Sequence, residues 1–132
     1  MKVVLDTNIF VSGIFWIGDS NKIIKLWKEG KLVLFTSREI INEFIKVMKD
    51  FKIKLPDNLI KEWVDLVTNN SILVEPKARF DIIKEDLSDN KFLDCAHEGK
   101  VNYIISNDKH LLKLKDFKGI KIVKPKDFMN TI

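Results

Sequence analysis

The length, composition and charge of the chain favour a single soluble domain. Of its 132 residues, 45% are hydrophobic and 32% are charged, which supplies both a core and a polar surface, so we expect one domain over residues 1–132. No run approaches the roughly 20 apolar residues of a membrane span, and the single Cys95 excludes an internal disulfide. Asp6 and Asn8 interrupt the first apolar run, which argues against a signal peptide. We therefore expect a cytoplasmic protein without a membrane partner.

The predicted elements alternate between strands and helices. β-branched residues dominate 2–6 without alternation, which is typical of a strand buried on both faces. Thr36 and Glu39 have the spacing of a capping box, which predicts a helix over 36–51. Further strands are expected at 31–35, 71–75, 102–106 and 120–123, and further helices at 20–30, 56–67, 88–100 and after Asp108, with one more turn around Phe128. Residues 76–87 match no single pattern.

This order predicts an α/β fold with a mostly parallel, five-stranded central sheet and helices on both faces. In such sheets the ligand site lies outside the carboxyl ends of the strands. Asp6 follows the first strand and Ser106 ends the fourth. Both are therefore expected at the same rim.

Four acids are candidates for one site at this rim. Asp6 and Asp108 each follow a strand, although each also suits the N-cap of a following turn or helix. Glu43 lies at the border of an apolar helical stripe, where a solvated glutamate is the simpler interpretation. Asp89 shares a helix face with apolar residues, and stabilisation by the helix dipole explains an acid in the first turn but not on a buried face. Asp94 points elsewhere on the same helix and reads as more peripheral.

Clustered carboxylates need compensation. Two of them about 4 Å apart repel by about 4 kcal/mol at an effective dielectric constant near 20. A hard divalent cation, Mg²⁺ or Mn²⁺, resolves this repulsion because it prefers oxygen ligands. Such a site suits hydrolysis of phosphodiester bonds by a metal-activated water. The whole chain has a net charge of +4, and without the four acids of the site the rest of it carries twice that charge. This balance favours a polyanionic substrate.

Four motifs in order carry a family resemblance: "VVLDTNIFVSG", "TSREIINEF", "DLSDNKFLDCA" and "YIISNDKHLL". Together they span nearly the whole chain, which resembles the PIN-domain proteins and, among them, the VapC-like toxins of toxin–antitoxin pairs. The resemblance implies a three-layer α/β/α sandwich and a Mg²⁺- or Mn²⁺-dependent endoribonuclease. It also implies an RNA substrate, a cognate antitoxin and a homodimer.

The resemblance assigns roles to particular residues. The catalytic and metal-binding acids of the family fall on Asp6, Glu43, Asp89 and Asp108. The supporting positions are Asn8, which would help to hold Asp6, Ser106 or Asn107 before the last acid, and Asp94 as a further ligand.

Two other functions compete with this one. The first is a PIN-fold module that binds RNA or protein without cleaving, for which the loss of an acid would be the mark. The second is a phosphotransfer enzyme, which Asn8 disfavours because a second aspartate is usual at that position; the glycine-rich phosphate loop is also missing. Lys46, Lys49, Lys52 and Lys54 are candidates for RNA contacts, while Trp16, Trp27 and Trp63 are expected in a core or interface rather than in base stacking.

Overall fold

A six-stranded sheet runs through the middle of the molecule, in the order β3-β2-β1-β4-β6-β5. The computed structural model describes all residues, 1–132. Five neighbouring strands are parallel, namely β3, β2, β1, β4 and β6, and the edge strand β5 is antiparallel to β6. The strands are β1 (Lys2–Leu5), β2 (Val33–Thr36), β3 (Ser71–Leu73), β4 (Tyr103–Ile105), β5 (Asp116–Phe117) and β6 (Ile120–Val123).

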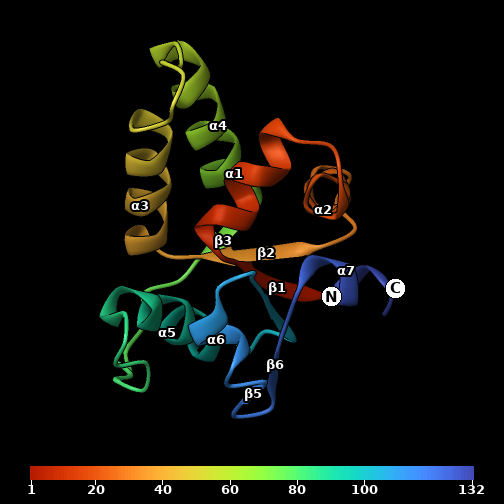
Figure 1. Ribbon diagram of the computed structural model, residues 1–132, viewed down its shortest axis with the longest axis vertical. Helices are drawn as coiled ribbons and strands as arrows, with labels where there is room; N and C mark the ends of the chain where they lie inside the picture. Colours follow the sequence, from red (N-terminus) through yellow and green to blue (C-terminus); the bar gives the residue numbers. More distant parts are fainter.

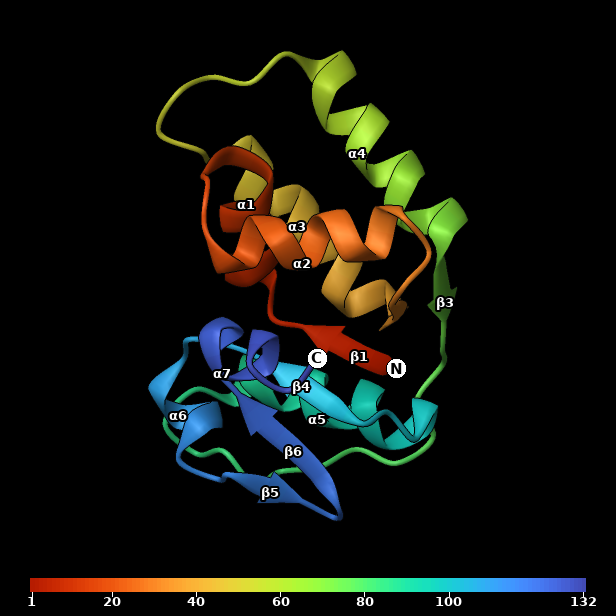
Figure 2. The same ribbon diagram turned by 90° about the vertical axis from the view of Figure 1, so that its right-hand side faces the viewer.

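Helices cover both faces of this sheet and form the outer two layers of the expected sandwich (Figures 1 and 2). One face carries α1 (Thr7–Phe15), α2 (Asp19–Lys28), α3 (Arg38–Lys49) and α4 (Asp57–Asn70), with α7 (Pro125–Met129) packed against α2. The other face carries α5 (Asn90–Gly99) and α6 (Lys109–Leu112), and a short 3-10 helix, η1 (Leu87–Asp89), leads into α5. The predicted α/β class is confirmed. No helix combines the length and the apolar character needed to cross a bilayer.

The expectation of five strands is wrong because of β5. The predicted helix after Asp108 ends at Leu112 instead of continuing through Leu114. The chain then forms a tight hairpin between β5 and β6, with positive φ at Lys118 (52°) and Gly119 (86°), the conformation that two-residue hairpin turns require. A strand of two residues is too short to leave a periodic pattern in the sequence.

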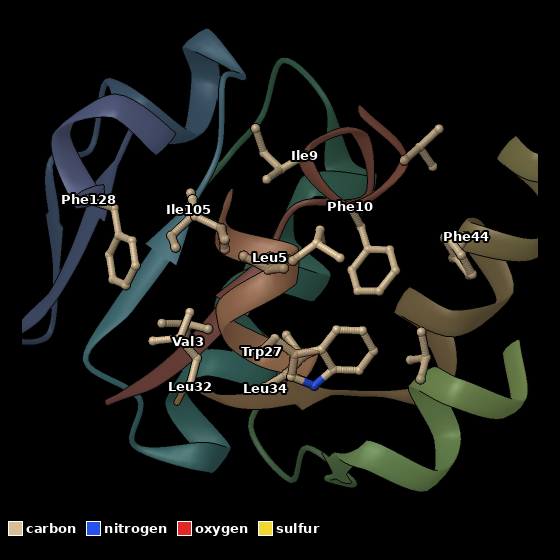
Figure 3. Close-up of a cluster of buried hydrophobic side chains, with 14 of the residues drawn as sticks. Val3, Leu5, Ile9, Phe10, Trp27, Leu32, Leu34, Phe44, Ile105 and Phe128 are labelled. Carbon is tan, nitrogen blue, oxygen red and sulfur yellow. The ribbon is translucent and has the colours of Figure 1, made fainter. Parts of the chain in front are cut away.

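A hydrophobic core lies on each face of the sheet, so its central strands are buried on both sides. Val3 and Leu5 point into the core beneath α1–α4, where Phe10 packs against Trp27 and Phe44 (Figure 3). Val4, between them, points into the opposite core beside α5. This two-sided burial explains the continuous apolar run of β1.

The helix α1 is missing from the sequence prediction, which has only a turn after Asp6. Its residues are apolar on most sides, so they show little helical periodicity. Gly13 allows α1 to approach α2 closely: a Cβ there would lie 2.5 Å from Ile24 Cγ1 and 2.7 Å from the Ser20 carbonyl oxygen. The sheet-to-helix turn at Asp6 is thus followed by a tightly packed helix, which fixes this end of β1.

Two predicted helix starts shift by one or two residues. Ser37, not Thr36, caps α3, and its Oγ accepts a hydrogen bond from the Ile40 N–H at 3.4 Å. Thr36 instead ends β2. At the start of the helix predicted over 88–100, Asp86 and not Ser88 is the cap: it caps η1, and α5 begins at Asn90.

Candidate metal and catalytic site

The four acids predicted from the sequence line one open hollow of about 670 Å³. It lies beyond the carboxyl ends of β1 and β4, and its walls include residues of α3 on one side and residues around η1 on the other. We call it the acidic hollow, and its lining consists of Asp6, Glu43, Asp50, Asp86, Asp89 and Asp108 with Asn8, Trp16, Lys46, Val47, Phe51, Lys52 and Ser88. The structure thus places the four side chains around one hollow, while their roles in catalysis and metal binding stay predictions.

Asp6 is held where β1 passes into α1. Its backbone N–H donates to the Ile105 carbonyl at 3.0 Å, which ties the end of β1 to β4. Its Oδ2 accepts a hydrogen bond from Ser106 Oγ at 2.6 Å, and its Oδ1 accepts one from the Asn8 N–H at 3.4 Å. Burial raises the pKa of Asp6, and the charges of Asp108 and Glu43 raise it further against these hydrogen bonds. The site therefore resists a second negative charge unless a cation is present.

Ser106 connects two of the acids. Its fully buried hydroxyl donates to Asp6 and accepts from the Asp108 N–H at 2.8 Å. Of the two supporting candidates before the last acid, Ser106 is thus inside the acidic site. Asn107 is exposed and lines a second hollow, formed by Ser12, Trp16, Ile17, Gly18, Asp19, Ser20, Asn21, Asn107, Lys124, Pro125 and Lys126.

Asp108 caps α6, as one reading of the sequence predicted. Its Oδ1 accepts hydrogen bonds from the N–H groups of His110 at 2.7 Å and Leu111 at 3.3 Å. The cap fixes the carboxylate through one oxygen. The other oxygen stays available to the acidic hollow.

Asp89 is the least compensated of the four acids. The residue is only 7% exposed, and its buried Oδ2 has no hydrogen-bond partner. Burial, followed by repulsion from Asp108, Asp86 and Asp6, raises its pKa to about 7, and Lys91 only partly opposes this shift. An unpartnered buried carboxylate oxygen is costly, so the protein's own contacts disfavour the charged form of Asp89.

Glu43 has a partner that the sequence reading missed. Lys91 Nζ forms an ion pair with its carboxylate and also donates to the Ser88 carbonyl at 2.8 Å. The Lys91 side chain is 10% exposed, so the pair links α5 with α3 across the end of the sheet. A sequence signal for Lys91 exists: a lysine in the first turn of a helix is unfavourable next to the helix dipole and therefore calls for another reason.

Asp94 lies apart from the acidic hollow. Its Oδ1 accepts a hydrogen bond from the Phe80 N–H at 2.7 Å, and its Oδ2 lies 3.6 Å from Arg79. Burial raises its pKa, while the Phe80 and Arg79 contacts lower it. These contacts give Asp94 a structural role in fixing residues 79 and 80.

Asn90 is a further residue whose part the sequence reading did not predict. Its buried side chain accepts from the N–H groups of Ile82 and Ile83 at 3.1 and 3.0 Å. It also donates to the carbonyls of Ile83 and Leu87 at 2.9 and 3.1 Å. These four bonds shape the irregular segment that precedes η1 and so position Asp86 and Asp89.

The oxygen donors of the acidic hollow fit a hard divalent cation. The free oxygen of Asp89, the free oxygen of Asp108 and the carboxylate of Asp6 are the donor type that Mg²⁺ and Mn²⁺ prefer. The side chains stand apart, since no three His, Cys, Asp or Glu residues are close enough to enclose an ion. Water would therefore complete the coordination, as is usual for Mg²⁺.

A three-layer α/β/α fold with an acidic hollow at the carboxyl ends of its parallel strands defines the class that the motifs indicated. The sequence pattern of the PIN domain matches residues 2–110, and the chain belongs to this family. The family comprises nucleases, so at this level the match supports the expected hydrolase.

Two similar proteins extend the comparison. An uncharacterised protein of Methanocaldococcus jannaschii, MJ1680, is 31% identical over 98% of this chain and 90% of its own length. The crystal structure of VapBC2 from Rickettsia felis bound to a DNA fragment from their promoter contains a similar chain. The two share a TM-score of 0.61 over 92% of this chain and 97% of the other, at 17% identity. This likeness shows that the fold is shared.

Proposed function

We propose that the protein is a metal-dependent endoribonuclease that hydrolyses RNA phosphodiester bonds at the acidic hollow, with Mg²⁺ or Mn²⁺. The observation that carries the proposal is the buried, unpartnered oxygen of Asp89 in a hollow lined also by Asp6 and Asp108. Family membership supports the nuclease activity. The hollow contains neither a histidine nor a cysteine, so its own groups favour activation of water over a covalent intermediate on those residues.

Each acid has a defined part in this proposal. When bound, the divalent cation would lower the pKa of a water and offset charge on the phosphate. Asp6, Asp89 and Asp108 would hold that cation, Ser106 keeps the carboxylate of Asp6 in one orientation, and the α6 cap does the same for Asp108. Glu43, held by Lys91, adds negative charge at the other wall of the hollow.

The direct test is cleavage of a labelled RNA by the purified chain in Mn²⁺, with an EDTA control. Asp6→Asn and Asp89→Asn each remove one charge at nearly constant volume, and each should lower the rate at least about 100-fold, a loss typical of removing a main electrostatic group. Asp65→Asn is the matched control, because Asp65 is exposed on α4 and pairs only with Lys61.

The outcomes separate the candidate functions. Cleavage that persists in EDTA and in Asp6→Asn identifies a contaminant and contradicts the mechanism. Binding of RNA without cleavage in any divalent metal identifies the non-catalytic module instead.

We further propose that the nuclease is the toxin of a toxin–antitoxin pair, acts in the cytoplasm and forms a homodimer. The similarity to a chain of the VapBC2 structure supports the pairing. Cys95 is buried and unpaired, and burial raises its pKa to about 12, which suits an unreactive thiol in a reducing compartment. Co-purification with the product of a neighbouring gene, together with relief of growth arrest by that product, tests the toxin role. Sedimentation tests the dimer.

A further inference from the structure

Trp16 is exposed, so the core position that the sequence allowed is wrong, while the interface position stays a prediction. It follows the last residue of α1 and is 56% exposed. The rings of Phe15 and Phe51 contact it at centroid distances of 5.9 and 5.8 Å, inclined by 81° and 64°. Neither ring lies parallel to the indole, so two aromatic neighbours hold the side chain while more than half of it faces solvent.

Trp16 stands on the boundary between two hollows. It lines the acidic hollow together with Lys46 and Lys52. It also lines the second hollow, of about 250 Å³, together with Lys124 and Lys126. The hollows adjoin again at residues 106–108, since Asn107 lines the second and Asp108 the acidic one. A path therefore runs from the acids, past an exposed indole, to a pair of lysines.

Aromatic side chains combined with lysines are the usual means of holding single-stranded nucleic acid. The indole stacks on a base of any sequence, and the lysines attract phosphates. A duplex keeps its bases stacked inside and offers no free base face to such a platform. Charge distinguishes the second hollow from a purely apolar protein-docking site, because its lining contains two lysines and one acid, Asp19, and is therefore net positive.

We infer that Trp16 stacks on an unpaired base of the substrate. Lys124 and Lys126 hold phosphates on one side, and Lys46 and Lys52 hold them where the strand enters the acidic hollow. This inference rests on the proposed ribonuclease function and adds a base-stacking residue, with its neighbouring lysines, to that site.

Binding measured in EDTA tests the inference without cleavage. A fluorescein-labelled oligouridine is titrated with the wild-type chain and with Trp16→Ala, Trp16→Phe and Ile72→Ala. We expect Trp16→Ala to weaken binding about 10-fold, within the range for loss of one stacked base, and Trp16→Phe to restore most of it. Ile72→Ala is the control because Ile72 is an exposed apolar residue, 46% accessible, that lines neither hollow; it should bind as the wild type does. Tryptophan emission should be quenched by RNA in the wild type and not in Trp16→Phe.

Three results would overturn the inference: unchanged affinity in Trp16→Ala, equal affinity for a duplex of the same length, or loss of dimers in Trp16→Ala with RNA affinity intact. The last result would assign the surface to contacts between copies of the chain. Failure of the proposed function looks different, since RNA would then bind through Trp16 without being cut in Mn²⁺. Melting curves confirm that each variant is folded.

Discussion

Asp89 is a carboxylic acid whose surroundings disfavour its charge. Because its pKa is raised from 3.8 to about 7 in the folded protein, the folded state binds the proton more tightly than the unfolded chain does. The contribution of Asp89 to the free energy of unfolding of the metal-free protein should therefore be greatest below about pH 4 and should be lost as the pH rises through about 7.

Asp89→Asn removes this penalty. In EDTA at about pH 8 we expect the variant to be more stable than the wild type by on the order of 2 kcal/mol, less than the full shift because water reaches the hollow. Denaturant unfolding across the pH range measures the difference. Asp86→Asn is the control of opposite sign: hydrogen bonding from Ser88 lowers the pKa of Asp86, so its charge stabilises the fold above the unfolded pKa. The variant loses this stabilisation, and the relief of repulsion on Asp89 offsets only part of the loss. Equal behaviour of the two variants would contradict the assigned burial of Asp89.

Lys91 forms an ion pair with Glu43, whose residue lines the acidic hollow. Lys91→Met leaves Glu43 without its partner, so in EDTA we expect a loss of about 1–2 kcal/mol, and a larger stabilisation by Mg²⁺ than in the wild type. Thermal melts with and without Mg²⁺ measure both effects. Lys61→Met, which breaks the exposed Lys61–Asp65 pair at 2.9 Å, should cost less than about 0.5 kcal/mol. Equal losses in the two variants would show that the Lys91–Glu43 pair stabilises the fold no more than an exposed pair does.

At the scale of elements, the segment before η1 depends on one side chain. Asn90→Ala removes four hydrogen bonds to the backbone of residues 82–87, and at roughly 1 kcal/mol each we expect a loss of about 3–4 kcal/mol. Hydrogen exchange of the Ile82 and Ile83 amides should accelerate. Asn102→Ala, which removes a single exposed bond to Lys2, should leave these amides protected. Unchanged exchange in Asn90→Ala would show that other contacts shape the segment.

The sequence was informative where the pattern is local. The apolar stripe of α3 and the unbroken run of β1 follow from periodicity and burial, and the rule for parallel strands correctly brought Asp6 and Asp108 to one rim. In contrast, α1 is apolar on most sides and β5 has two residues, so neither has a distinguishing period. The role of Asn90 depends on the irregular course of residues 82–87, which has no periodic pattern. The partner of Lys91 is Glu43 in α3, which only the tertiary structure brings near it.

At the scale of the whole molecule, the fold concentrates negative charge at one rim while the chain as a whole carries +4. The lysines beside Trp16 lie next to this rim. RNA binding in EDTA should therefore weaken with added salt, and Lys124→Ala combined with Lys126→Ala should reduce the slope of log affinity against log salt by about 1–2, close to 0.7 for each phosphate contact with a single strand. Titrations at several salt concentrations measure this slope, and an unchanged slope would remove the second hollow from the RNA path.

The most direct measurement is anomalous diffraction from crystals soaked in Mn²⁺. The proposal predicts a peak in the acidic hollow, within coordination distance of Asp6 or Asp89, that disappears in Asp89→Asn. A peak absent from this hollow at Mn²⁺ concentrations that support RNA cleavage would contradict the claim that these acids hold the catalytic ion.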